Sequence, residues 1–379
     1  KRQPQLDALY RHIGDARFAL GDFELRYRMH HRAGRAIRAV LEAAVDDAVR
    51  NDAAYRLAKI HFQKSQFAEA VDALERIDGN VPATIRDDIE FLRANVSLAV
   101  DEPEVSIATL NALQKSREYS AYAAYNLGIA YLRAGDAVRG ARQLDRAGTM
   151  SVNDPGELAI RDKSNLVLGS LRLEQGRYDD AVQCLNRVRL DGPFANQALL
   201  SAGWASLSGE NIERALVPWG ILAGREVTDL AAQEAMLALP YAYGELNIHG
   251  RAATSYARAL DVFGGEVDKL NESIDSIRDG RFLDALNREE IRQDREWVIR
   301  LRSLPETPET FYLMELLATH EFQSSLENYL DLADLRGKIV AWRNSFDAFD
   351  DMVGIRREHY DPMLPGVDQQ FRELDSRLR

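Results

Sequence analysis

Residues that could perform chemistry are few in this chain and lie far apart. The seven histidines are His12, His30, His31, His61, His249, His320 and His359. Apart from the adjacent His30–His31 pair, none lies at a spacing that metal ligands use. Adjacent residues on a helix point in different directions, so this pair is typical of a loop or a solvated helix start. We therefore expect no bound metal and no other cofactor.

A thiol and a histidine–glutamate pair are the remaining catalytic candidates, and both lie in apolar surroundings. Cys184 is the single cysteine, and it falls in a predicted helix whose core positions include Ala181 and Leu185, which favours packing over nucleophilic catalysis. His320 and Glu321 lie in an apolar helix, where a structural histidine is expected rather than a general base. The chain has no glycine-rich phosphate loop and no GxSxG or HExxH motif. The sequence predicts a protein that is not an enzyme.

Composition indicates a folded protein with enough apolar material for a core. Of its 379 residues, 46% are hydrophobic and 28% are charged. The net charge of −12 argues against a protein that neutralises nucleic-acid phosphates. No apolar run approaches the length of about 18 residues that a membrane helix needs. The single cysteine excludes an internal disulfide, which suits the cytosol and the periplasm equally.

A recurring pattern of small residues organises the first two thirds of the chain. In the helical stretch "AYAAYNLGIAYLRAGD", Gly128 should cost about 1 kcal/mol relative to alanine, so a second element is expected to approach it closely. Twelve residues later Gly140 opens another helix, and Leu144 follows after four more. The corresponding first small positions are Gly21, Ala58, Ala94, Gly128, Gly169, Gly203 and, with a proline, Pro240. Their steps of 37, 36, 34, 41, 34 and 37 residues predict pairs of helices that cross at these positions.

A period in the mid-thirties that consists of two helices is typical of an α-solenoid. The stretch "YNLGIAY" at 125–131, with Gly135 and Asp136 at the turn, is similar to the consensus of the tetratricopeptide repeat family. Pro82 and Pro193 lie where that family ends a repeat. The resemblance implies an all-α, right-handed solenoid of about seven helix pairs over residues 1–263. A non-repeat helical capping or docking region over 264–379 would follow.

The resemblance also implies a binding surface. In this family the second, fifth, ninth and twelfth positions of each first helix line the concave face of the solenoid. All seven fifth positions of this chain are apolar or aromatic, which favours a peptide groove with aromatic anchors. The implied partner-binding residues are Tyr55, Lys59, Phe62, Phe91, Asn95, Tyr122, Tyr125, Ile129, Leu132, Trp204 and Tyr241. The alternative is that neighbouring repeats bury many of these side chains.

The segment after Phe263 differs from the repeats. Between Val262 and Arg379 it carries 25 acidic residues against 16 basic ones. Gly264–Gly265 predicts a hinge, which a helix and a turn at Asp279–Gly280 follow.

A long helix is predicted to end at about His359, and from Leu332 its apolar residues alternate three and four apart, as in a coiled-coil seam. These residues are Leu335, Ile339, Trp342, Phe346, Phe349 and Val353. We expect this helix to pack against the helices between Glu266 and Arg302 or to cap the open end of the solenoid. The alternative is a dimerisation or docking arm formed by Ile339, Trp342, Phe346 and Phe349.

Together these features predict a non-catalytic scaffold or adaptor that binds partner proteins or peptides on its concave surface, with a homodimer possible through the C-terminal helix. The arginine-rich composition and the long tail are similar to those of solenoids in proteobacterial envelopes. That likeness implies a periplasmic or envelope-associated accessory of a secretion, polysaccharide-export, energy-transducing or protease complex. Because Lys1 follows no methionine or apolar leader, any signal or lipid-anchor segment is expected to have been removed or never present. The alternatives are a cytosolic regulator that senses a peptide or ligand, and an enzyme with a site between solenoid and tail.

Overall fold

The computed structural model describes residues 37–42, 45–285, 308–313, 316–317 and 319–378. Within these ranges every regular element is a helix, as predicted. The predicted first repeat, around Gly21, and the His30–His31 pair lie outside the described residues. No described helix is both long enough and apolar enough to cross a membrane.

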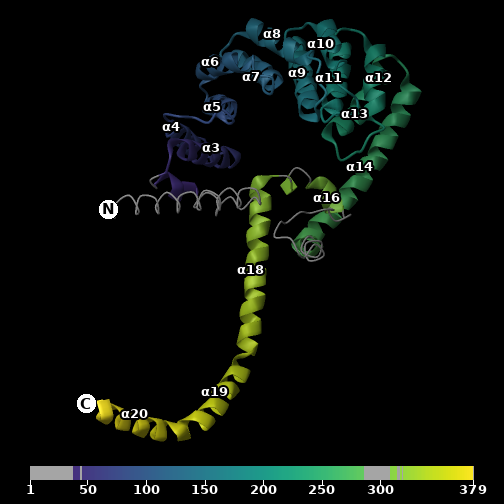
Figure 1. Cartoon of the computed structure of the whole chain (residues 1–379). Coiled ribbons are helices and arrows are strands. Elements are labelled where there is room, and N and C mark those ends of the chain that lie inside the picture. Colours follow the sequence, from purple (N-terminus) through teal and green to yellow (C-terminus); the bar gives the residue numbers. More distant parts are fainter. Residues whose placement is uncertain (1–36, 43–44, 286–307, 314–315, 318, 379) are drawn as a thin grey trace.

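Six helix pairs follow one another along a curved solenoid (Figure 1). They are α3 (Asp47–Gln63) with α4 (Phe67–Glu75), α5 (Arg86–Ala99) with α6 (Pro103–Leu113), α7 (Ser120–Arg133) with α8 (Ala137–Gly148), α9 (Pro155–Glu174) with α10 (Tyr178–Leu185), α11 (Ala195–Ser208) with α12 (Ile212–Leu222), and α13 (Leu230–Glu245) with α14 (His249–Arg278). The two helices of each pair pack on one another, and each of the first five pairs packs on the next. The core is therefore a chain of small clusters that runs the length of the solenoid.

The two helices of a pair cross at the small residues that the sequence singles out. A Cβ atom placed on Gly128 would lie 2.6 Å from Cγ of Leu144. In the fifth pair Trp219 takes the place of that leucine, and a Cβ atom on Gly203 would lie 2.2 Å from its Nε1. Since carbon atoms in contact are separated by about 3.5–4.0 Å, these crossings require glycine. The predicted reason for Gly128 is confirmed.

Helix α9 starts earlier than the first helices of the neighbouring pairs. It has 20 residues, against 14 in each of α5, α7 and α11. The Asp154 carboxylate caps its start by accepting hydrogen bonds from the backbone N–H groups of Gly156 (2.8 Å) and Glu157 (3.2 Å). Pro155 occupies the first turn, where no N–H is needed. The added turns account for the 41-residue step and bring Asp154 and Glu157 toward the concave face.

The predicted hinge at Gly264–Gly265 is wrong. Helix α14 passes through both glycines without a break and ends at Arg278. Two interior glycines cost about 2 kcal/mol of helix propensity, and packing of the helix on both sides of them offsets this cost: Ala259 is buried before the pair and Ser273 after it. The predicted turn is confirmed, because α14 stops there and Gly280 adopts the left-handed conformation with φ of 77°.

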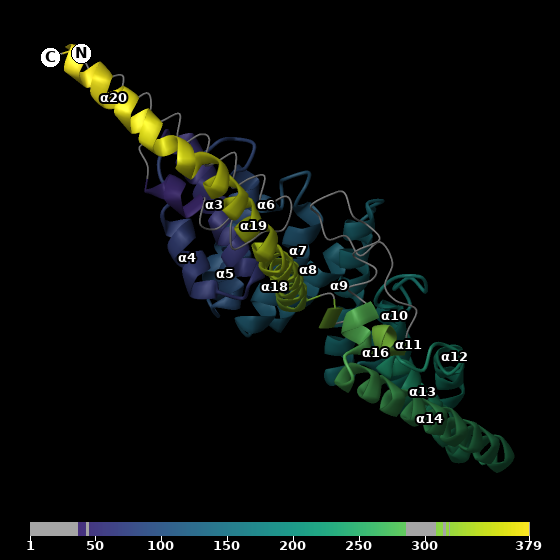
Figure 2. The ribbon, with the colours of Figure 1, turned by 90° about the horizontal axis from the view of Figure 1, so that it is seen from below.

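The C-terminal region begins beside α14 and then leads away from the solenoid. In α16 (Pro308–Tyr312) the Tyr312 hydroxyl donates a hydrogen bond of 2.6 Å to Oε2 of Glu266. A cluster of Phe282, Leu317, Leu326 and Leu330 buries the start of α18 (His320–Asn344). Helices α19 (Phe346–Tyr360) and α20 (Leu364–Leu378), joined by the short 3-10 helix η1 (Asp361–Met363), continue α18 as a curved arm (Figures 1 and 2).

The apolar seam of this arm does not pack against the rest of the described chain. Ile339, Trp342, Phe346 and Phe349 are between 53% and 68% exposed. Leu335 and Val353, at the two ends, are also exposed. The expected internal packing therefore holds at the start of α18, against Phe282, and is wrong for the seam. The seam is exposed because α18 contacts the cluster only through its first turns and then projects away from the solenoid (Figure 1). Its role as a dimerisation or docking arm stays a prediction.

Candidate functional site

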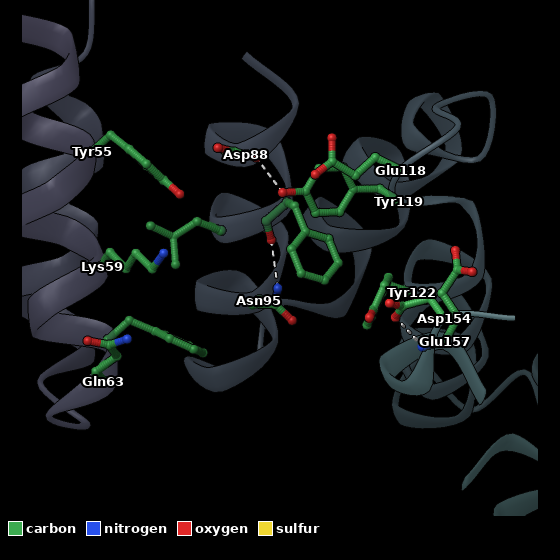
Figure 3. A pocket seen from close by; sticks show the side chains of 13 residues that line it. Tyr55, Lys59, Gln63, Asp88, Asn95, Glu118, Tyr119, Tyr122, Asp154 and Glu157 are labelled. Carbon is green, nitrogen blue, oxygen red and sulfur yellow. Dashed lines mark hydrogen bonds between the residues drawn. The ribbon is translucent and has the colours of Figure 1, made fainter. Parts of the chain in front are cut away.

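A hollow of about 700 Å³ lies on the concave face, where α3, α5, α7 and the start of α9 face one another (Figure 3). We call it the α3–α9 groove. It is lined by Tyr55, Lys59, Phe62, Gln63, Asp88, Phe91, Leu92, Asn95, Glu118, Tyr119, Tyr122, Asp154 and Glu157. Six of these belong to the predicted concave set, namely Tyr55, Lys59, Phe62, Phe91, Asn95 and Tyr122. The structure thus brings the first half of that set together across consecutive repeats.

Aromatic rings form the middle of the α3–α9 groove. The Phe91 ring centre lies 4.8 Å from that of Tyr119 and 6.1 Å from that of Tyr122, which it meets edge to face. Next to them the Asn126 amide donates a 2.9 Å hydrogen bond to Oδ1 of Asn95, and the Asn95 amide donates to the backbone oxygen of Phe91 at 2.8 Å. This network connects α5 and α7.

The tyrosine hydroxyls of the groove lie beside carboxylates. The Tyr119 hydroxyl donates a short hydrogen bond to Asp88. Burial and the Asp88 carboxylate raise the pKa of Tyr119, and burial together with the Asp88 charge raises the pKa of Tyr55 to about 12. Burial, Asp154 and Glu157 raise the pKa of Tyr122. All three phenols therefore remain neutral hydrogen-bond donors well above neutral pH.

These shifts predict a loss of stability in alkali. Tyrosines of the unfolded chain have a pKa near the ordinary value of 10.0. A phenol whose pKa is raised in the folded state therefore keeps its proton at pH values at which the unfolded chain has lost it. The contribution is complete below pH 10 and disappears as the pH rises through the folded-state pKa, which is about 12 for Tyr55. We expect the urea midpoint to fall across this interval, and to fall less in Tyr119→Phe. If the urea midpoint fell equally with pH in the parent and in Tyr119→Phe, the raised pKa of Tyr119 would not contribute to the loss of stability.

The charges of the α3–α9 groove are mostly negative. Four carboxylates line it, from Asp88, Glu118, Asp154 and Glu157, against the single ammonium group of Lys59. Asp88 accepts from Tyr119 and Asp154 caps α9, whereas no cation among the described residues forms an ion pair with Glu118 or Glu157. The groove combines aromatic walls with a carboxylate rim.

Three other predicted residues face the core of the next repeats. Tyr125, Ile129 and Leu132 pack against the cluster that contains Leu144. The Lys163 ammonium lies 5.6 Å from the centre of the Tyr125 ring and covers it. These three side chains therefore pack between neighbouring repeats, which was the alternative to binding a partner.

The last two predicted residues lie in later repeats, outside the groove. Trp204 meets the fully buried Trp219 edge to face at 4.9 Å, and its Nε1 donates a 2.6 Å hydrogen bond to Oε1 of Glu234. These contacts tie α11 to α12 and α13. Tyr241, on α13, is 46% exposed and contributes to no described hollow.

The acidic part of the groove was missed in the sequence. Asp88 occupies the second position of its repeat, a position that faces the concave side in the family, and could have been found from that rule. Tyr119 and Glu118 lie just before α7, and Asp154 and Glu157 lie at the start of α9. The 41-residue step was the only signal for the last two residues.

Two of the chemical candidates of the sequence can be followed in the described residues, the thiol and a metal site. Cys184 is buried, as the packing interpretation predicted, and burial raises the pKa of its thiol, which stays protonated. The part of the chain that the structure describes contains no group of three His, Cys, Asp or Glu side chains that could hold a metal ion.

Helix pairs that cross at small residues and stack into a curved array define an α-solenoid protein. The tetratricopeptide repeat family model matches residues 25–83, 91–156 and 166–224. The chain belongs to the tetratricopeptide repeat family. Repeats of this family generally serve as non-catalytic protein-interaction modules.

Several solved structures are similar to the chain at low identity. A structure of MamA (MSR-1) is 20% identical and covers 48% of this chain and 99% of its own, with a TM-score of 0.36. PilF of Pseudomonas aeruginosa is 16% identical, covering 59% and 96%, with a TM-score of 0.42. The apo quorum sensor NprR from B. thuringiensis is 9% identical, covering 66% and 87%, with a TM-score of 0.43. No curated protein matches the chain.

Proposed function

We propose that this protein is a non-catalytic scaffold that holds a segment of a partner protein in the α3–α9 groove. One observation carries the proposal: five aromatic side chains line a hollow of about 700 Å³ that crosses four consecutive repeats. Aromatic residues supply much of the binding energy of protein interfaces. A groove that runs across helices accepts an extended or helical segment along its length.

The partly exposed state of these rings supports the same conclusion. Tyr55, Phe62, Phe91, Tyr119 and Tyr122 are all half-buried, although the chain buries other large side chains completely. In Figure 3 the labelled tyrosines from α3 and from the region of α7 lie on opposite sides of the groove. A segment that entered between these sides would cover both.

Replacing Tyr122 with alanine is expected to weaken peptide binding by about 2 kcal/mol, or roughly 30-fold in Kd, as for a buried aromatic anchor. The probe is a fluorescent peptide chosen by display selection on the full chain, with affinity measured by anisotropy. Trp204→Ala is the matched control, because Trp204 packs between repeats outside the groove. It should lower the melting temperature and leave the affinity unchanged. Equal loss of affinity in both variants would place the binding surface elsewhere.

We propose further that the scaffold serves a bacterial cell-envelope complex. This location depends on the likeness of the arginine-rich composition and the long tail to those of envelope solenoids and stays a prediction, with the cytosol as the alternative. Fractionation of cells that express the tagged gene from its own locus is the measurement. Recovery in the periplasmic or membrane fraction is expected, and recovery only in the cytosol would contradict the proposal.

A further inference from the structure

We infer that the α3–α9 groove selects a peptide segment that carries a basic side chain, arginine or lysine, between apolar residues. The inference rests on the proposed function and names the chemistry of the partner. It follows from the positions of the charges and aromatic rings in the groove.

The carboxylates of the groove are concentrated on one side. Figure 3 shows Glu118, Asp154 and Glu157 on the side of Tyr119 and Tyr122, whereas Lys59 projects from α3 on the opposite side. Glu118 and Glu157 have no cationic partner among the described residues. Two carboxylates beside a hollow, to which the described residues offer no countercharge, attract a cation from a partner.

Aromatic rings lie next to these carboxylates. Tyr119 follows Glu118 directly in the chain and stacks on Phe91 at 4.8 Å, and the charges of Asp154 and Glu157 act on the Tyr122 hydroxyl. A guanidinium or ammonium group is attracted to the face of such rings, and its alkyl stem packs on apolar surface. Rings and carboxylates in one wall therefore suit a long basic side chain better than a neutral one.

The same arrangement excludes other ligands. An acidic peptide or a nucleic-acid backbone would place its charges against four carboxylates and gain contact with one ammonium group only. A purely apolar segment would leave the carboxylates near its binding site without a partner and partly desolvated, which costs free energy. Apolar residues on either side of the basic one would instead cover Phe62 and Phe91.

The test is a selection of random dodecapeptides displayed on phage, performed on the full chain. We expect the bound peptides to be enriched in arginine or lysine at one position with apolar neighbours. The best peptide, made again with its basic residue replaced by methionine, should bind at least tenfold more weakly. The affinity of the original peptide should fall as salt is raised.

The charge-reversal variant Glu118→Lys/Glu157→Lys should lose the peptide and select acidic sequences instead. Glu104→Lys is the control, because Glu104 is an exposed carboxylate on α6 outside the groove, and it should bind like the parent. If the double reversal does not fold by circular dichroism, Glu118→Gln/Glu157→Gln replaces it, with a tenfold loss expected.

The two proposals fail in different ways. Peptides whose binding is lost in Tyr122→Ala but which lack an enriched basic residue would overturn the inference and leave the scaffold function standing. If no selected peptide depends on Tyr122, the α3–α9 groove is not the binding site, and both proposals fall.

Discussion

Replacing Gly128 with leucine is expected to lower the free energy of unfolding by about 3 kcal/mol, at the upper end of the usual cost of overpacking. The new Cβ alone would lie 2.6 Å from Cγ and 2.8 Å from Cδ2 of Leu144, which is fully buried. Behind it, the backbone oxygen of Gly140 is only 3.3 Å away, so the second helix must move outward. Urea denaturation followed by circular dichroism measures the effect.

The matched control is Gly264→Leu, in the middle of α14. Gly264 is exposed and has nothing within 4 Å of an added Cβ. Leucine there should raise stability by up to about 0.8 kcal/mol through helix propensity alone. If the two variants had the same midpoint, close helix crossing would not be the reason for Gly128.

A second large effect is expected at the crossing of α11 and α12, where Gly203 faces Trp219. Gly203→Ala would place a methyl group 2.2 Å from Nε1 and 2.4 Å from Cε2 of a fully buried, rigid indole ring. We expect it to cost about 3 kcal/mol, even though alanine is the better helix former. Trp219→Leu alone should also destabilise, by about 2 to 3 kcal/mol, because it leaves a cavity.

The double variant Gly203→Ala/Trp219→Leu should lose less free energy of unfolding than the two single variants lose together, by at least about 1 kcal/mol. It recreates a combination that the chain already uses, because alanine and leucine occupy these two positions in the first two described pairs. Ala58 with Leu74, and Ala94 with Leu110, are buried there. Strictly additive losses would show that the two positions do not touch in solution.

The repeat architecture could be predicted because one local feature recurs with a period. Small residues such as Gly128 and Gly140 have a clear physical meaning inside a helix, namely close approach, and six copies of the feature are present in the described residues. The number of helices and their pairing follow from this alone. The long α9 was visible in the sequence only as a 41-residue step between two small positions. The step does not show that the added residues line the groove.

The groove could be predicted only in part. Repeat position shows that Tyr55, Phe91 and Tyr122 lie on the concave side, but not whether the next repeat covers them. Tyr125 holds the same repeat position as Phe91, yet it packs beside Lys163 and the cluster that contains Leu144 and does not line the α3–α9 groove. The difference depends on contacts between repeats, which a single-repeat pattern does not contain.

The tail was the least predictable region, because two of its signals have more than one physical solution. Paired glycines such as Gly264–Gly265 mark a hinge only where the flanking packing does not hold the helix. An apolar seam such as that of Ile339 and Phe346 predicts that the helix packs against another helix. The pattern does not show whether that helix belongs to the same chain.

The unbroken course of α14 has a mechanical consequence. Its first half belongs to the last repeat and its second half carries the contact with α16, so no break in the helix separates the last repeat from that contact. Thirty residues of helix span about 45 Å, and a tilt of about 5° at one end moves the other by about 4 Å. Small changes of curvature add up along a solenoid. Any change in curvature when the groove is filled would therefore be amplified at the base of α18, and would sweep the arm through a still larger arc.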